Sequence, residues 1–211
     1  MTRELPIFPL PIVLFPGAPQ ALHIFEPRYR RMLQDCLAGD RRFGVAYVAA
    51  DPAPDPAREL VPKPGDVGCV AVIHSRQPLP DGRSDIVTVG ERRFVLRRWV
   101  ERDRPYRVAD VDEFDDEPVD PDEVRALVAD VRDRFARLTR AESVLGASPD
   151  DEASLPQDPA RVSFLVAAAL DLEPPAKCVL QAGRSTSARL RQLASVLQPL
   201  AADAERRATI R

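Results

Sequence analysis

The sequence predicts an α+β fold, with a β-barrel carrying one helix over residues 1–115 and a helical bundle over residues 116–211. Three observations support this prediction. The first half consists of short apolar runs separated by proline- and glycine-containing turns, as in a small closed sheet. The second half repeats apolar residues at helical spacing. Between the halves, residues 112–122 (DEFDDEPVDPD) are acidic and contain proline, which indicates a domain boundary.

Six or more short strands are expected in the first half. Prolines interrupt its opening apolar runs, and proline cannot donate a hydrogen bond to a sheet, so these strands are expected at edges or crossings. Val67–Ile73 is apolar almost throughout, as in a strand buried on both faces. Pro80-Asp81-Gly82 predicts a turn, and Gly90-Glu91 predicts the turn of a hairpin. The predicted strands are Leu5–Phe8, Ile12–Phe15, Ala21–Phe25, Phe43–Ala50, Val67–Ser75, Asp85–Val89, Arg92–Val100 and Tyr106–Val111.

One helix is expected among these strands, starting at Pro27 and ending at Gly39 in a left-handed cap. In the second half, Asp120 and Pro121 are expected to start a helix of about five turns. Further helices are expected to begin at Asp158-Pro159 and at Pro174-Pro175. A last helix, capped by Ser185 or Ser187, carries the apolar stripe Leu190, Leu193, Ala194, Leu197 and Leu200.

Composition excludes several classes of protein. The net charge of −3 and the pI near 5.5 argue against a protein that mainly grips nucleic acid or an anionic membrane. Lys63 and Lys177 are the two lysines, and neither lies in a phosphate-binding P-loop, which excludes ATP hydrolysis by that route. No apolar run is long enough to span a membrane and no leader peptide is recognisable, so a cytoplasmic protein is expected.

No metal, cofactor or catalytic residue is predicted. Cys36, Cys69 and Cys178 are widely spaced and are expected to be buried free thiols. His23 and His74 do not complete a metal-ligand pattern, and each is expected to be a hydrogen-bonded structural histidine. No Gly-x-Ser-x-Gly motif occurs, so nothing indicates a serine nucleophile.

The most specific signal is the opening stretch of residues 5–33, LPIFPLPIVLFPGAPQALHIFEPRYRRML. Further motifs follow in order: DRRFGV from Asp40, VGCV from Val67, LPDGR from Leu79, VGERRF from Val89 and AKCVLQ from Ala176. Together they resemble the LON domain, the amino-terminal substrate-binding domain of ATP-dependent Lon proteases, which is also found as free-standing bacterial proteins. The resemblance covers nearly the whole chain, is specific in the first 100 residues or so, and weakens between Asp112 and Pro175.

This resemblance implies a PUA-like β-barrel followed by a helical bundle, and a role in binding rather than catalysis. The P-loop and the serine–lysine dyad of a full Lon protease are not recognisable here. The first hypothesis is a non-catalytic module that binds unfolded or exposed peptide segments and could present them to a protease or a chaperone. An RNA-binding PUA-like module is the alternative, which the charge disfavours. A hydrolase is a third hypothesis, without support from motifs.

The candidate peptide-binding residues are an apolar surface around Phe15, Phe25 and Tyr29, with Glu26, Arg28 and Arg93 fixing the direction of a bound segment. Arginine suits forked contacts with carbonyl or carboxylate groups, and tyrosine offers an apolar face with a polar tip. Structural roles are the alternatives. Glu26 would favour the helix N-terminus, Arg28 would pair with a carboxylate, and Arg93 would form a buried ion pair. Trp99 could belong to the core, an exposed platform or an interface.

Overall fold

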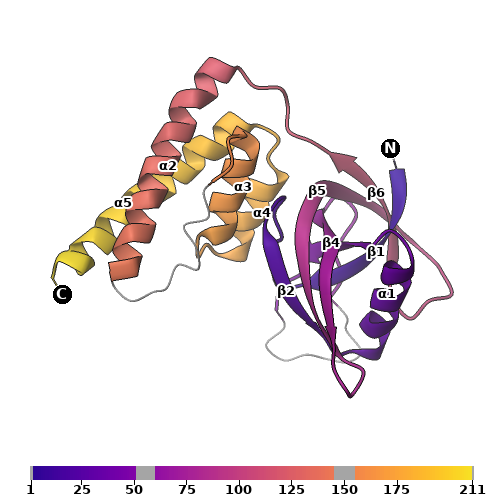
Figure 1. The fold of residues 1–211 in the computed structure, drawn as a ribbon. Coiled ribbons are helices and arrows are strands. Elements are labelled where there is room, and N and C mark those ends of the chain that lie inside the picture. Colours follow the sequence, from indigo (N-terminus) through magenta and orange to yellow (C-terminus); the bar gives the residue numbers. More distant parts are fainter. Residues whose placement is uncertain (1, 51–59, 145–154, 211) are drawn as a thin grey trace. The chain divides into compact units, whose positions relative to one another are not determined.

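The computed structural model describes residues 2–50, 60–144 and 155–210. The chain forms two compact units (Figure 1). The β unit comprises residues 1–115 and 171–182, and the helical unit comprises residues 116–170 and 183–211. Division into independently folding domains at residue 115 stays a prediction.

The β unit contains a closed barrel, as expected. Its sheet has the order β2-β5-β4-β3-β1-β6, and β5 also pairs with β6, which closes the ring (Figure 1). β5 is long enough to pair with two other strands: residues 84–89 pair with β2, and residues 93–100 pair with β6. The strands are β1 (Thr2–Leu10), β2 (Pro19–Ile24), β3 (Arg42–Tyr47), β4 (Val67–Pro78), β5 (Ser84–Val100) and β6 (Val108–Phe114).

Two local predictions in the barrel are wrong. β5 continues through Gly90 without a hairpin, because the chain of residues 15–18 crosses β5 at this glycine. The Gly17 amide donates to the Gly90 carbonyl (2.8 Å), and the Gly90 amide donates to the Ala18 carbonyl (3.0 Å). Ile12–Phe15 forms no strand and instead leads into this crossing. A glycine inside a strand allows such a close backbone approach.

Helix α1 (Pro27–Ala38) lies where the sequence predicts it and buries the side of the helix that carries Tyr29, Met32, Leu33 and Cys36. These side chains join a core cluster with Phe8, Phe43 and other barrel residues. The predicted left-handed cap at Gly39 is wrong, because that residue has a φ of −108°. The left-handed residue is Arg41 (φ 63°), whose amide donates to the Cys36 carbonyl (2.9 Å).

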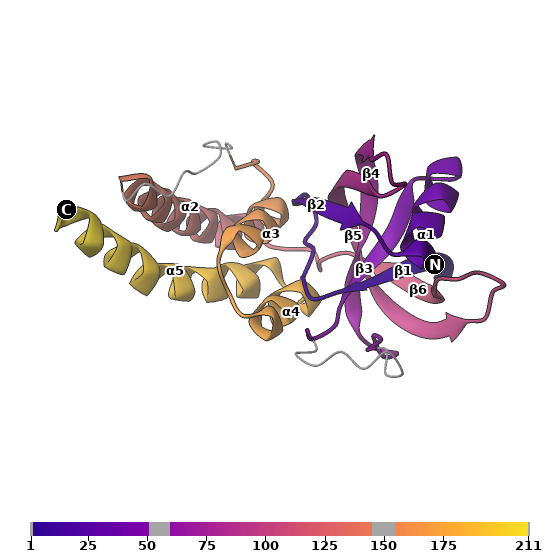
Figure 2. The same ribbon diagram turned by 90° about the horizontal axis from the view of Figure 1, so that it is seen from below.

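The helical unit contains α2 (Pro121–Val144), α3 (Pro159–Ala169) and α5 (Thr186–Thr209), whereas α4 (Pro174–Ala182) belongs to the β unit. The Ser185 side chain caps α5 by accepting from the Ala188 amide, as one of the two predicted alternatives. α2 and α5 lie side by side (Figure 2). Two ion pairs between them, Arg191–Glu123 and Arg137–Glu205, have the same sequence separation of 68 residues, so the two helices run parallel.

A buried arginine of α5 contacts both the segment that precedes α2 and helix α3. The Arg189 side chain is 1% exposed and forms an ion pair with Asp116, which precedes α2. It also donates to the Ser163 hydroxyl (2.8 Å) and the Gly183 carbonyl (2.9 Å), and its guanidinium lies 3.9 Å from the centre of the Phe164 ring. A buried charge needs this many partners because it has lost its hydration.

The cysteines are free thiols, as predicted, but the prediction that all three are buried is wrong for Cys178. Cys36 and Cys69 are buried, whereas Cys178 is partly exposed. Burial raises the pKa of the Cys36 thiol to about 12 and raises the pKa of Cys69 and Cys178 as well.

Since the thiolate is the reactive form, we expect iodoacetamide at pH 8 to modify Cys178 first and the other two only slowly. Peptide mass spectrometry measures the order, and a sample in 6 M urea is the control; faster modification of Cys69 would contradict the prediction.

Candidate functional site

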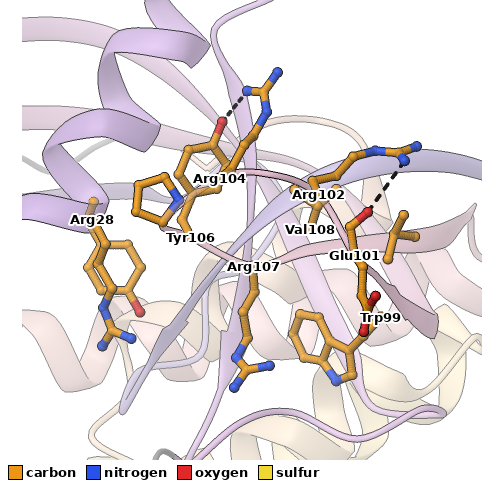
Figure 3. Close-up of a pocket in the computed structure, with 11 residues that line it drawn as sticks. Arg28, Trp99, Glu101, Arg102, Arg104, Tyr106, Arg107 and Val108 are labelled. Carbon is orange, nitrogen blue, oxygen red and sulfur yellow. Dashed lines mark hydrogen bonds between the residues drawn. The ribbon is translucent and has the colours of Figure 1, made fainter.

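A hollow of about 580 Å³ lies in the β unit, between the first turn of α1 and the chain that joins β5 to β6 (Figure 3). Its walls come from Arg28 and Tyr29 of α1 and from residues 99–102 and 104–108. α1 and the β5–β6 connection are far apart in the chain, and the barrel brings them together because α1 packs its apolar face on the core. The lining is rich in arginine and aromatic residues: Arg28, Arg102, Arg104, Arg107, Tyr29, Trp99 and Tyr106.

Three of the four arginines stack on aromatic rings of the same hollow. The guanidinium of Arg28 lies 4.6 Å from the centre of the Tyr29 ring, that of Arg104 lies 5.6 Å from Tyr106, and that of Arg107 lies 5.6 Å from Trp99. Figure 3 shows Arg107 and the Trp99 ring side by side. Stacking of this kind contributes about 0.5–1 kcal/mol at exposed sites and fixes the plane of the guanidinium.

Three of the four arginines of the hollow form ion pairs with carboxylates. Arg28 Nε donates to Glu26 Oε2 (2.9 Å), Arg104 Nη1 donates to Asp35 Oδ2 (2.9 Å), and Arg102 pairs with Glu4. These ion pairs are solvent-exposed on the arginine side, so each contributes little to stability. They do lower the positive potential of the hollow, which therefore offers oriented donors and aromatic faces more than a strong positive field.

Asp35 fastens the β5–β6 connection to α1. Its carboxylate accepts from the Tyr106 hydroxyl (2.7 Å) and also pairs with Arg104 and, one turn back on α1, with Arg31 (3.1 Å). The Tyr106 hydrogen bond and the two arginines lower the pKa of Asp35. Burial, and the hydrogen bond to Asp35, raise the pKa of Tyr106. Asp35 is therefore ionised and Tyr106 protonated at neutral pH, which keeps this contact intact.

Comparison with known proteins adds the family. A model described as the ATP-dependent protease La (LON) substrate-binding domain matches residues 4–198. The chain belongs to this LON domain family. The Lon N-terminal domain protein from Xanthomonas campestris is 26% identical, with a TM-score of 0.62 over 92% of this chain and 98% of that one. The N-terminal domain of a Mycobacterium avium complex Lon protease, 20% identical, shares the fold, with a TM-score of 0.68 over 95% of this chain and 99% of that one.

Two curated relatives are whole Lon proteases. The Lon protease of Cytophaga hutchinsonii is 32% identical over 141 residues, and that of Flavobacterium johnsoniae is 29% identical over 140 residues. The matched regions make up 64% and 65% of this LON domain, and 17% of each relative. The LON domain thus corresponds to a small part of these proteases.

The structure separates the predicted site residues of this LON domain. Arg28 and Tyr29 line the hollow, and Glu26 pairs with Arg28 at its side. Phe25 is 57% exposed. Phe15 is completely buried, so its side chain presents no surface to a ligand.

Arg93 lies inside the fold. Its side chain is buried, donates to the Gln181 carbonyl of α4 (2.8 Å) and lies 4.5 Å from the centre of the Phe114 ring. Gln181 in turn donates to the Leu14 carbonyl (2.6 Å). Arg93 thus helps to hold α4 on the barrel of the β unit.

Sequence reasoning missed most of the wall formed by the β5–β6 connection, namely Arg102, Arg104 and Arg107. The adjacent arginine pairs Arg92-Arg93 and Arg97-Arg98 lie on β5, where neighbouring side chains point to opposite faces, so they do not indicate this wall. The available signal was the segment WVERDRPYR from Trp99 to Arg107, which combines arginines with two aromatic residues in a short connection. Loops that carry such residues often bind ligands.

None of the helices within residues 2–50, 60–144 and 155–210 combines the length and the apolar character that crossing a membrane requires. Within the same residues, no group of three or more histidine, cysteine, aspartate or glutamate side chains could hold a metal ion.

Proposed function

We propose that this LON domain binds exposed polypeptide segments, without catalysing a reaction on them, at the hollow beside α1. The observation that carries the proposal is the set of three arginine–aromatic stacks around one hollow. Aromatic faces accept apolar side chains, and the edges of stacked guanidinium groups donate to main-chain carbonyl groups. The volume of about 580 Å³ lies within the range of small-ligand pockets and accommodates a few side chains. The family description, a substrate-binding domain, supports this function.

Phe25, Glu26 and Arg28 extend the proposed contact surface. Phe25 offers an exposed apolar ring three residues before Arg28, and the Glu26–Arg28 pair would fix the direction of a bound segment. We propose that, in the cytoplasm, the domain presents the bound polypeptide to a protease or a chaperone. The relatives support this because they are Lon proteases of which the chain matches one part.

Substitution of Trp99 tests the location of the site. We expect Trp99→Ala and Arg28→Ala each to weaken binding of a fluorescein-labelled, permanently unfolded polypeptide about tenfold, because each removes one stacking partner and its contacts with the ligand. Fluorescence anisotropy measures the affinity. Arg83→Ala is the matched control, since Arg83 is an exposed arginine of the same unit that pairs with Asp81 in a turn.

Tyr29→Ala is the weaker variant for this test, because Tyr29 is 5% exposed and its ring lies 4.2 Å from that of Phe8, so it also supports the core. Unchanged affinity in both Trp99→Ala and Arg28→Ala, with folding intact by circular dichroism, would place the binding surface elsewhere. Loss of affinity in Arg83→Ala as well would indicate non-specific electrostatic binding.

Binding of single-stranded RNA is a second candidate, favoured by the same stacks, because bases stack on aromatic rings and arginine planes. The carboxylates beside Arg28, Arg102 and Arg104 disfavour it, since they would repel phosphates. A salt series with labelled RNA distinguishes the two candidates. RNA binding that falls steeply with salt would favour the RNA-binding module, whereas polypeptide binding that persists in salt would favour the first proposal.

A further inference from the structure

Strand β2 ends the sheet, and its outer edge is unpaired in the described part of the chain. Its inner edge pairs with β5 along all its residues, from Pro19 opposite Val89 to Ile24 opposite Ser84. No described strand pairs with the other side of β2. An unpaired edge presents main-chain donors and acceptors that can pair with another extended chain.

The pairing shows which residues of β2 face outwards. The Gly90 amide donates to the Ala18 carbonyl, and the Thr88 hydroxyl donates to the Gln20 carbonyl, so Ala18 and Gln20 direct their carbonyl groups towards β5. Inward- and outward-facing residues alternate in an antiparallel pair. The main-chain groups of Ala21 and His23 therefore point away from the sheet. Of these, the Ala21 carbonyl accepts a hydrogen bond from the Gln20 side chain (2.9 Å).

The edge of β2 lacks the features that usually block strand addition. Its sequence, PQALHI, contains no lysine, arginine, aspartate or glutamate, and its proline is at the first position. The end of β4 differs, because it carries Arg76 and Pro78, and the Arg41 guanidinium covers the carbonyl groups of Ile73 (3.0 Å) and His74 (3.4 Å). Charges and prolines on an edge prevent pairing with other chains. β2 is thus the more receptive of these two edges.

The side chains next to the edge indicate what kind of segment would fit. Ala21 lies opposite Val87, which is 41% exposed, and His23 lies opposite Asp85 and pairs with it (2.6 Å). Beyond the strand, the exposed Phe25 ring stacks on His23 at 5.9 Å. Apart from the His23–Asp85 pair, these side chains are apolar. An added strand would place every second side chain on it.

We propose that the outer edge of β2 binds an extended segment of a substrate polypeptide as an added β-strand, with uncharged, apolar residues at alternate positions. Main-chain hydrogen bonds supply affinity in this mode of recognition, and alternate side chains supply selectivity. The inference rests on the proposed function and deepens it, because it specifies the conformation and side-chain pattern of the bound segment. Chain continuity supports it, since β2 leads through Phe25 directly to Arg28 at the hollow.

The decisive experiment uses the full chain and a labelled ten-residue peptide with valine or leucine at alternate positions and serine or threonine between them. Two versions carry backbone N-methyl groups, one on the odd and one on the even residues. An added strand bonds to β2 through only one of these two sets. We expect one N-methylated version to lose affinity at least about tenfold and the other to bind nearly as the parent, because only the first loses several main-chain hydrogen bonds to β2 at once.

Amide hydrogen exchange followed by NMR locates the strand on the protein. We expect the parent peptide to slow exchange of the Ala21 and His23 amides, while those of Gln20 and Leu22, already bonded to β5, change little. Equal affinity of both N-methylated peptides, or protection on β4 instead of β2, would overturn the inference while leaving polypeptide binding intact. No binding of either the parent peptide or the unfolded polypeptide would overturn the proposed function itself.

A substitution in β2 provides a second measurement. Ala21→Pro removes an outward-facing donor without removing a bond to β5, and proline is tolerated at such edge positions. We expect peptide affinity to fall about fivefold or more, as for one lost hydrogen bond. Ala21→Val is the matched control, because it keeps the amide and favours the extended conformation. Equal affinity of the two variants, both folded by circular dichroism, would contradict strand addition at β2.

Discussion

Asp116→Ala is expected to destabilise the helical unit by about 3–5 kcal/mol, because it leaves the buried guanidinium of Arg189 without its carboxylate. The Arg189 side chain is 1% exposed, and the Asp116 side chain is 11% exposed, so water does not replace the lost partner. The remaining partners of Arg189 are neutral: the Ser163 and Thr186 hydroxyls, the Gly183 carbonyl and the Phe164 ring. They orient the charge but do not compensate it.

Urea unfolding followed by circular dichroism at 222 nm measures this loss, since the long helices α2 and α5 dominate the signal. Fluorescence of Trp99, the single tryptophan, reports on the β unit separately. Glu205→Ala is the matched control, because it breaks the exposed Arg137–Glu205 pair between α2 and α5 and should cost less than about 1 kcal/mol. A loss of the same size in Asp116→Ala and Glu205→Ala would show that burial of the Arg189 pair does not matter.

Most of the fold could be predicted because its elements have local signals. Helix α1 begins at a proline and buries one apolar stripe, and α5 begins at a serine cap, so each is recognisable within a few residues. The resemblance of the motifs indicates the family independently of these signals, and the family model that matches residues 4–198 confirms it. The failures concern backbone contacts. Gly90 has the local chemistry of a turn, and only the crossing of Phe15–Ala18 explains why it lies inside a strand.

The candidate site could be predicted only in part, for a related reason. Arg28 and Glu26 follow from the helix start, where charged residues next to a proline attract attention. Trp99 lies near the end of β5, and Arg107 lies in the connection from β5 to β6. Their position beside α1 depends on closure of the sheet. Phe15 shows the opposite error: the sequence predicts it at the end of a strand and on the binding surface, yet the crossing buries it completely.

The crossing at Gly90 leads to the last prediction. Gly90→Ala is expected to destabilise the β unit by about 3 kcal/mol or more, the upper end of the range for overpacking. A Cβ at this position would lie 2.1 Å from the Phe15 carbonyl oxygen and 2.8 Å from its carbon. Both atoms belong to the backbone, so rotation of a side chain cannot relieve the clash. Either β5 or the Phe15–Ala18 segment must move, which breaks the two hydrogen bonds between Gly90 and residues 17 and 18.

Gly39→Ala provides the comparison, because its added Cβ would approach no closer than 3.5 Å to the atoms around it. Trp99 fluorescence during urea unfolding measures both variants, and Gly39→Ala should lose less stability than Gly90→Ala, because no backbone atom obstructs its Cβ. If Gly90→Ala fails to accumulate as folded protein, Gly90→Ser would fail too, whereas a cavity at the crossing would let both fold. Equal stability of the Gly90 and Gly39 variants would mean that the chain does not cross β5 at this point, and the position of Phe15 in the core would have to be revised with it.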